Sequence, residues 1–169
     1  MEQTIKKNLD QLLQSWFTAT SDTYPQESAR VLGKDANRFD NPVGAVTRES
    51  LEDILNLITG KFDRNSLEKA LDPVIRIRAV QAFEPADAVS FVFALKEIGV
   101  GVIDPADAHK FDRVVDEIAL AAFNRLMKCK EEIFLLKATE SKRRVHRAFE
   151  RAGLVAELKE EDLLGSNKS

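Results

Sequence analysis

The chain has 169 residues, of which 44% are hydrophobic and 31% are charged, and its formal net charge is −3. This composition excludes an intrinsically disordered chain and provides enough apolar residues for one sizeable core. The slight negative charge argues against nucleic-acid binding, and the single cysteine, Cys129, excludes a disulfide framework within the chain.

The N-terminal residues Met1–Lys7 are polar and lack the apolar core of a signal peptide. No stretch of the sequence approaches the roughly 18 apolar residues that a membrane-spanning helix requires. We therefore expect a cytoplasmic protein that does not insert into a membrane.

Apolar residues recur with helical spacing along nearly the whole chain, which predicts an all-α, single-domain helical bundle of about six helices. The first predicted helix covers residues 2–20 and ends before the dipeptide Tyr24-Pro25. A short helix is expected over residues 25–32, and residues 37–40 are expected to connect it to the next helix.

Asn41 and Pro42 have the pattern of an N-cap residue followed by a proline in the first helical turn. This pattern predicts a third helix, which Gly60 ends. A fourth helix is predicted over residues 66–83, with Pro73 either as a kink or as a second helix start.

Pro85 opens a predicted fifth helix, and Asp104-Pro105 repeats the pattern of a cap and a proline. No glycine or proline then follows until Gly153, and apolar residues keep one stripe from Phe111 to Leu136, about seven helical turns. We expect one long helix over residues 105–152. Helices of this length are typical of coiled coils and of dimer interfaces.

Residues 1–152 are thus predicted to form one helical domain, followed by a charged tail over residues 153–169. Three arginines, Arg143, Arg144 and Arg147, form a basic cluster near the end of the long helix. A charge cluster of this kind is either a solvated helix face or a docking surface for an acidic protein partner. Acidic residues in the following tail offer a third interpretation, in which basic and acidic segments of two copies pair.

Several polar side chains lie among closely spaced apolar neighbours on the predicted helices. Arg76, Arg78 and Gln81 occur in a largely apolar run, and Arg48 and Lys96 occupy similar positions on other helices. At least one of Arg76, Arg78 and Gln81 should be partly buried, and a buried arginine requires a carboxylate or an anionic ligand. The alternatives are internal ion pairs with neighbouring helices and a polar pocket for a small anion.

The sequence shows no constellation of reactive side chains. The two histidines, His109 and His146, lie too far apart on one predicted helix to bind a common metal ion. There is no HExxH motif, no P-loop and no GxGxxG motif, and Cys129 falls on the apolar stripe, where a thiol is usually inert. We therefore expect no catalytic residues, no metal site and no cofactor.

An ordered series of fragments resembles the N-terminal domain of RsbT co-antagonist proteins, in the RsbRD-like branch of these stressosome proteins. The series spans about residues 9–142 and comprises Trp16, Tyr24-Pro25, Arg38-Phe39, Asn41-Pro42-Val43-Gly44, the run from Ile75 to Gln81, Phe83, Pro85, Ala88, Phe91 and Leu95-Lys96. The resemblance implies a globin-like, haem-free sensory domain that dimerises through its terminal helices. In such proteins a C-terminal helix leads to a phosphorylatable STAS output domain, which the sequence up to Ser169 does not include.

The function expected from the sequence is a non-enzymatic sensory or regulatory interaction module that acts as a homodimer and contacts a regulatory protein. The alternative is a domain that binds a small anionic metabolite in a pocket between helices. In that alternative the lining residues would be Arg48, Arg78, Gln81 and Lys96.

Overall fold

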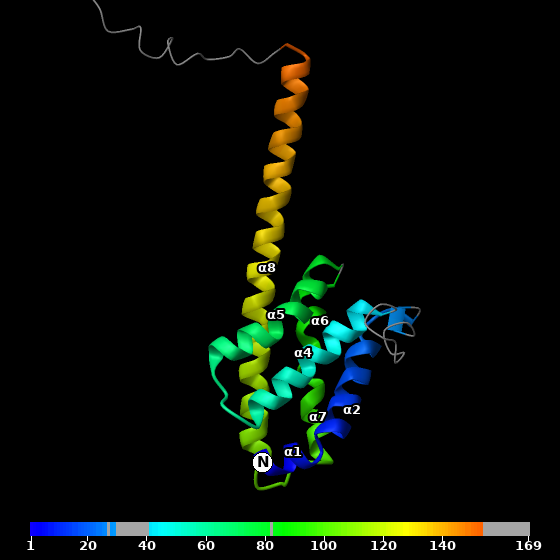
Figure 1. The fold of residues 1–169 in the computed structure, drawn as a ribbon, viewed down its shortest axis with the longest axis vertical. Helices are drawn as coiled ribbons and strands as arrows, with labels where there is room; N and C mark the ends of the chain where they lie inside the picture. Colours follow the sequence, from blue (N-terminus) through cyan, green and yellow to red (C-terminus); the bar gives the residue numbers. More distant parts are fainter. Residues whose placement is uncertain (27, 30–40, 82, 154–169) are drawn as a thin grey trace, which may run out of the picture. The chain divides into compact units, whose positions relative to one another are not determined.

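The computed structural model of the protein describes residues 1–26, 28–29, 41–81 and 83–153. Every regular element within these ranges is a helix, as Figure 1 shows: α1 (Glu2–Lys7), α2 (Leu9–Asp22), α4 (Pro42–Ile58), α5 (Arg64–Val80), α6 (Pro85–Ser90), α7 (Ala94–Val100) and α8 (Ala108–Arg151). The predicted all-α fold with one long C-terminal helix is confirmed. Within the described part of the chain, no helix is long and apolar enough to span a membrane.

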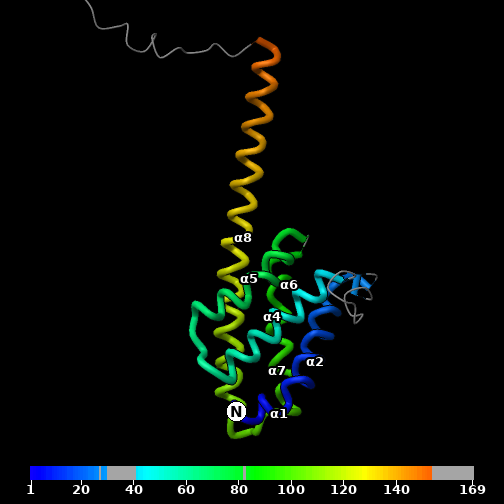
Figure 2. The backbone as a smooth tube through the Cα atoms, viewed as in Figure 1, coloured from blue at the N-terminus to red at the C-terminus, as the bar shows by residue number. Residues whose placement is uncertain are grey.

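The chain divides into two compact units, Met1–Lys130 and Glu131–Ser169. The first contains α1 to α7 and the first part of α8, and the described part of the second contains the remainder of α8 (Figure 2). The predicted boundary between a domain and a tail at residue 152 stays a prediction. Most of that tail lies outside the described residues, as do most of the predicted helix at 25–32 and the connector at 37–40.

The single helix expected over residues 2–20 is interrupted at Asn8, so this prediction was wrong in detail. The Asn8 side chain donates a hydrogen bond to the Thr4 carbonyl oxygen at 2.8 Å, and its backbone leaves the helical region at φ −114° and ψ 21°. Asparagine competes with the helix for backbone partners in this way. The chain then restarts as α2, which buries Leu12, Trp16 and Phe17.

The helix predicted after Asn41 is confirmed as α4. The Asn41 side chain accepts a hydrogen bond from the Gly44 N–H at 2.8 Å, and Pro42 occupies the first helical turn. A Cβ atom at Gly44 would lie 2.2 Å from the Asn41 amide nitrogen, so this cap requires glycine at that position. The helix packs its buried face, which includes Leu51 and Ile54, against α2 and α5.

The fourth helix begins two residues earlier than predicted, at Arg64, because Asp63 caps it. The Asp63 carboxylate accepts hydrogen bonds from the Ser66 N–H at 3.0 Å and from the Ser66 hydroxyl at 2.8 Å. Pro73 lies inside α5 without ending it. The buried face around it, including Leu71 and Ile75, holds this stretch in helical form against α4.

The fifth predicted helix is two short helices, α6 and α7, which is a correction to the sequence prediction. The segment between them is held by hydrogen bonds of the i→i+3 type, from Val92 to Val89 and from Phe93 to Ser90. The Phe91 carbonyl oxygen instead accepts a hydrogen bond from the Trp16 indole at 2.8 Å. Because this carbonyl oxygen accepts its hydrogen bond from a side chain of another helix, it does not accept one from a backbone N–H of its own helix, and the helix is interrupted there.

The long helix begins at Ala108 rather than at Pro105, because the Asp104 side chain holds the preceding residues in a turn by accepting a hydrogen bond from the Ala106 N–H at 2.8 Å. In the first unit its buried stripe contacts the bundle: Phe111, Val115, Ile118, Ala122 and Leu126. Ion pairs tie the same part of α8 to the bundle, from Arg125 to Asp72 and from Lys96 to Asp116.

Candidate functional site

Arg78 on α5 is completely buried within the first unit, with no exposed side-chain surface. Its Nε donates a hydrogen bond to the Ala88 carbonyl oxygen at 2.8 Å. Its Nη2 donates to the Thr23 hydroxyl at 2.9 Å and to the Asp87 carbonyl oxygen at 3.0 Å. These acceptors are neutral, and no carboxylate in the described part of the chain forms an ion pair with the guanidinium. Arg78 is therefore a buried charge held by dipoles.

Three aromatic rings surround the same guanidinium. Its central carbon lies 4.3 Å from the ring centroid of Phe83, and 5.1 Å from those of both Tyr24 and Phe91. The Tyr24 and Phe83 rings meet edge to face with their centroids 5.1 Å apart. Aromatic faces attract cations, so this arrangement offsets part of the cost of burying the charge.

Burial lowers the pKa of the Arg78 guanidinium from its ordinary value, while the Tyr24 hydroxyl and the Asp87 carboxylate partly oppose that shift. The Tyr24 hydroxyl opposes the shift through its proximity to the guanidinium and through a hydrogen-bonding contact that lies outside normal hydrogen-bond geometry. The second group with a shifted pKa is the exposed Asp63 carboxyl, which is lowered chiefly by the hydrogen bond from the Ser66 N–H.

Three buried polar atoms at this site make no hydrogen bond with any described residue. They are Arg78 Nη1, the Tyr24 hydroxyl oxygen and Gln81 Oε1. Gln81 follows Arg78 by three residues, a spacing that places both side chains on one face at the end of α5. Each unsatisfied buried group costs about 1–3 kcal/mol, and a charged one costs more. The guanidinium of Arg78 and two side chains of this site, Tyr24 and Gln81, thus each carry one unsatisfied atom.

A cavity of about 710 Å³ opens beside this cluster. Tyr24 and Gln81, which carry two of the three unsatisfied atoms, form part of its wall. Small-molecule sites commonly have a volume between about 300 and 1,000 Å³ and combine apolar walls with a few polar groups. The described lining consists of Thr23, Tyr24, Pro25, Ser28, Gln81, Phe83, Asp87 and Ser90.

The fold positions this cluster through the break that separates α6 from α7. Arg78 uses the carbonyl oxygens of Asp87 and Ala88, and Trp16 uses that of Phe91, so side chains from α5 and α2 hold the end of α6. Phe91 then stacks on Trp16, with centroids 6.2 Å apart, and also contacts the guanidinium.

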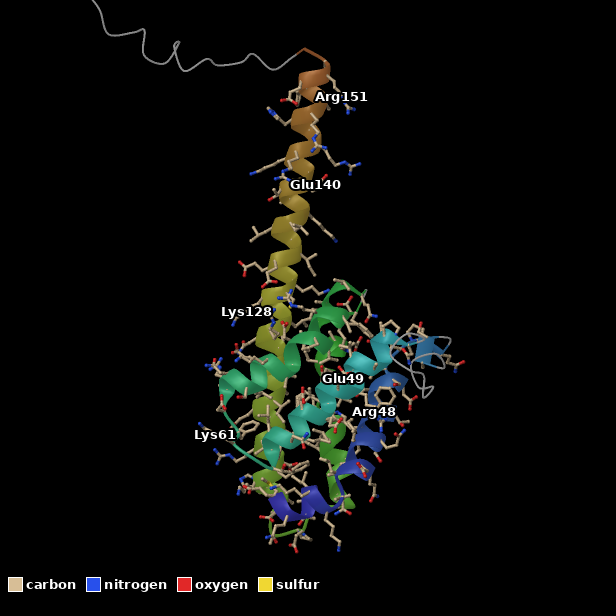
Figure 3. All side chains as sticks on the ribbon, viewed as in Figure 1. Arg48, Glu49, Lys61, Lys128, Glu140 and Arg151 are labelled. Carbon is tan, nitrogen blue, oxygen red and sulfur yellow. The ribbon has the colours of Figure 1, made fainter. Side chains whose placement is uncertain are left out.

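Of the four residues predicted to line an anion pocket, only Gln81 lines the cavity. Arg78 is completely buried next to two of the lining residues, Thr23 and Asp87, to which it donates hydrogen bonds. Arg48 lies on α4, as Figure 3 shows, and donates a hydrogen bond to Gln14 at 2.9 Å. Lys96 pairs with Asp116 at 2.7 Å. Lys96 thus forms the kind of ion pair between helices that was the alternative interpretation from the sequence, whereas Arg48 bonds a neutral amide. The hydroxyl and aromatic groups of the cavity were not predicted.

The arginines predicted as a docking surface lie in the second unit. Arg143, Arg144 and Arg147 are exposed, and the side chains of this part of α8 point outward around the helix in Figure 3. His146 pairs with Glu150 at 3.1 Å on the same segment. Cys129, the single cysteine of the chain, is buried in the first unit. Within the described ranges, no group of three or more His, Cys, Asp or Glu side chains is placed to hold a metal ion.

The described elements define an all-helical domain with a long C-terminal helix and a buried arginine beside a cavity. The chain belongs to the family described as the RsbT co-antagonist protein rsbRD N-terminal domain, whose sequence model matches residues 10–141. The resemblance stated from the sequence is thereby confirmed, and the family makes this a stressosome-related regulatory domain. No curated protein and no solved structure matches the chain. The globin-like relationship implied by the resemblance stays a prediction.

Proposed function

We propose that this protein is a non-enzymatic regulatory interaction module that forms a homodimer in the cytoplasm. The observation that carries the proposal is that exposed apolar side chains share one helix face in the second unit. Phe134 is 70% exposed and Val145 is 51% exposed, and their spacing places them within about 20° of each other around the helix. Single apolar residues on a surface are ordinary, but a periodic series on one helix is typical of an interface.

The spacing of these residues supports helix pairing. Residues at alternating intervals of four and three form one seam along the segment, which we call the α8 seam: Phe134, Ala138, Ser141, Val145 and Ala148. This is the heptad spacing of coiled coils, in which the seam faces a partner helix. Its small members allow a partner helix to approach closely. A second copy of the chain supplies an identical seam, so a dimer covers both at once.

The energy available from such pairing is substantial. Burying a largely exposed phenylalanine side chain contributes about 2 kcal/mol, and a symmetric dimer buries two copies of it. The two copies of Phe134 alone would therefore change the dimer dissociation constant by roughly a thousandfold, at 1.4 kcal/mol per factor of ten.

Two arginines of the basic cluster point away from the seam. At about 100° per residue, Arg143 and Arg147 lie on the side of the helix away from Ser141 and Val145, whereas Arg144 flanks the seam at about 60° from Ser141. A dimer formed through the seam leaves Arg143 and Arg147 accessible. They are suited to an acidic surface of a regulatory protein, because arginine forms bidentate hydrogen bonds with carboxylates.

The shifted pKa values of Asp63 and Arg78 fit a role without catalysis. Asp63 is a helix cap, and Arg78 is a buried structural cation. Both shifts have structural causes, and neither group is a nucleophile paired with a general base, which is the arrangement that covalent catalysis requires.

Amide hydrogen exchange tests the pairing. Helical segments gain most of their stability from packing, so the amides of residues 134–150 should be protected at high protein concentration and lose protection on dilution. Phe134→Glu and Val145→Glu should remove that protection. Thr139→Glu adds the same charge on the opposite side of the helix and should leave it intact. Fast exchange of this segment at every concentration would contradict the proposal.

The role of the basic cluster is tested separately by a pull-down with this chain as bait and purified stressosome proteins as prey, followed by salt washes. Exchanging Arg143 and Arg147 for glutamine should release a bound partner and leave the dimer unchanged. Equal capture by the variant and by the unmodified chain would remove the cluster from the interface.

A further inference from the structure

The unsatisfied atoms beside Arg78 specify the chemistry of a complementary ligand. Arg78 Nη1 carries two N–H donors and the Tyr24 hydroxyl carries one O–H donor, so together they call for an acceptor that is rich in lone pairs. Gln81 Oε1 is an acceptor and calls for a donor. A complementary ligand would therefore carry one group that accepts several hydrogen bonds and, next to it, a second group that donates one.

The charges at the site limit the charge of that ligand. Arg78 contributes one buried positive charge, and the exposed Asp87 carboxylate, which lines the cavity, contributes a negative one. A multiply charged anion would be repelled by Asp87 after its first charge was neutralised. A single carboxylate directed at Arg78 fits this balance, and an adjacent ammonium or hydroxyl group can donate to Gln81 or to Asp87.

The cavity also has an apolar side. Tyr24, Pro25 and Phe83 contribute apolar surface to its wall. Its volume of about 710 Å³ exceeds what a two-carbon acid fills and leaves space for a hydrocarbon side chain.

We propose that this cavity binds a small monocarboxylic acid that carries an amino or hydroxyl group on the neighbouring carbon and an apolar side chain. The carboxylate accepts hydrogen bonds from Arg78 Nη1 and from the Tyr24 hydroxyl. The neighbouring donor binds Gln81 Oε1, and the apolar side chain lies against Phe83. A rotation of the Tyr24 or Gln81 side chain, both of which line the cavity, admits the carboxylate to the buried guanidinium.

Titration with defined probes tests this site, and the chain contains its own reporter. Trp16 is the only tryptophan, and it stacks on Phe91, which in turn contacts the Arg78 guanidinium. The probes are L-leucine, L-phenylalanine, and their 2-hydroxy analogues 2-hydroxyisocaproate and phenyllactate. We expect saturable binding of at least one of these acids, seen in Trp16 fluorescence and confirmed by calorimetry. The hydroxy acids distinguish a requirement for an ammonium group from a requirement for any donor.

Three comparison ligands define the specificity. Isocaproate lacks the neighbouring donor and isoamylamine lacks the carboxylate, so both should bind at least about tenfold more weakly than the best acid. Inorganic phosphate should not compete with that acid. Binding of phosphate or of isocaproate as tight as that of the four acids would overturn the assignment of the ligand class.

Variants of the intact chain connect binding to the cavity. Tyr24→Phe and Gln81→Leu each remove one unsatisfied atom and keep most of the side-chain volume, so both proteins should fold. Each should weaken binding by about tenfold or more, the loss of one hydrogen bond to a charged ligand. Arg48→Gln, which alters a cation outside this cavity, should bind as the unmodified chain does. Failure of all four acids to bind at millimolar concentration, or equal binding by the Tyr24 and Gln81 variants, refutes the proposal. The dimer is measured separately, so neither outcome bears on it.

Discussion

Replacement of Arg78 by methionine tests how much the buried guanidinium contributes to the stability of the fold. The guanidinium donates three hydrogen bonds, to Thr23 and to the carbonyl oxygens of Asp87 and Ala88. Hydrogen bonds of a charged group contribute about 1.5–3 kcal/mol each, so about 4.5 kcal/mol is a low estimate of what is lost. Methionine fills much of the same volume but leaves these acceptors buried without a donor.

The cost of burying the charge of Arg78 opposes the loss of these hydrogen bonds in the free energy of unfolding. The variant no longer buries a charge that lacks a carboxylate partner, and the lowered pKa of Arg78 shows the direction of this cost. Because the three aromatic rings already offset part of it, we expect the hydrogen bonds to prevail. The expected net change is a loss of about 2–4 kcal/mol in the free energy of unfolding.

Urea denaturation measures this change as a shift of the midpoint, with the slope of the transition unchanged. Arg76→Met is the matched control, since Arg76 is an exposed arginine on the same helix that pairs with Asp72 at 3.0 Å. A surface ion pair contributes at most about 1 kcal/mol, so this variant should remain close to the unmodified chain. An Arg78→Met protein as stable as the unmodified chain, or more stable, would refute the reasoning, because the buried charge would then cost more than its hydrogen bonds supply.

Two further predictions concern the packing and the capping of the helices. At Gly99 an added Cβ would lie 2.5 Å from the ring of Phe111, so Gly99→Ala should destabilise the protein by about 1–3 kcal/mol. Gly101→Ala, which meets no atom within 4 Å, should unfold at nearly the same urea concentration as the unmodified chain; equal stability of both variants would contradict the packing. The hydrogen bonds from Ser66 lower the pKa of Asp63, so its contribution to stability is present above the ordinary pKa of aspartate, about 3.9, and is lost as the pH falls through the lowered value. Asp63→Asn keeps a capping side chain that does not titrate, so its stability should fall less steeply in acid, and identical acid unfolding curves would count against the cap.

Local signals in the sequence located several helix ends correctly. Asn41 followed by Pro42 marked the start of α4, because a cap and a first-turn proline act within a few residues of chain. The cap at Asp63 had a comparable signal, a polar residue three positions before Ser66, but the prediction placed the start at Ser66 itself. The break at Asn8 depends on one side chain competing for a backbone acceptor, which apolar spacing does not reveal.

The candidate site was only partly predictable because its members are brought together by tertiary contacts. The apolar run around Arg78 indicated that a charge would be buried, and it is. The spacing could not show that Arg48 and Lys96 pair elsewhere, since their partners lie on other helices. It also could not show that Tyr24, predicted only as part of a helix-ending dipeptide, places its ring against the guanidinium.

Sedimentation equilibrium of the unmodified chain shows whether the α8 seam pairs two copies. We expect a mass of twice the 19.0 kDa of one chain at high micromolar concentration. Phe134→Glu should lower the mass to that of a single chain under the same conditions. A monomeric mass for the unmodified chain throughout the micromolar range would rule out pairing through the seam.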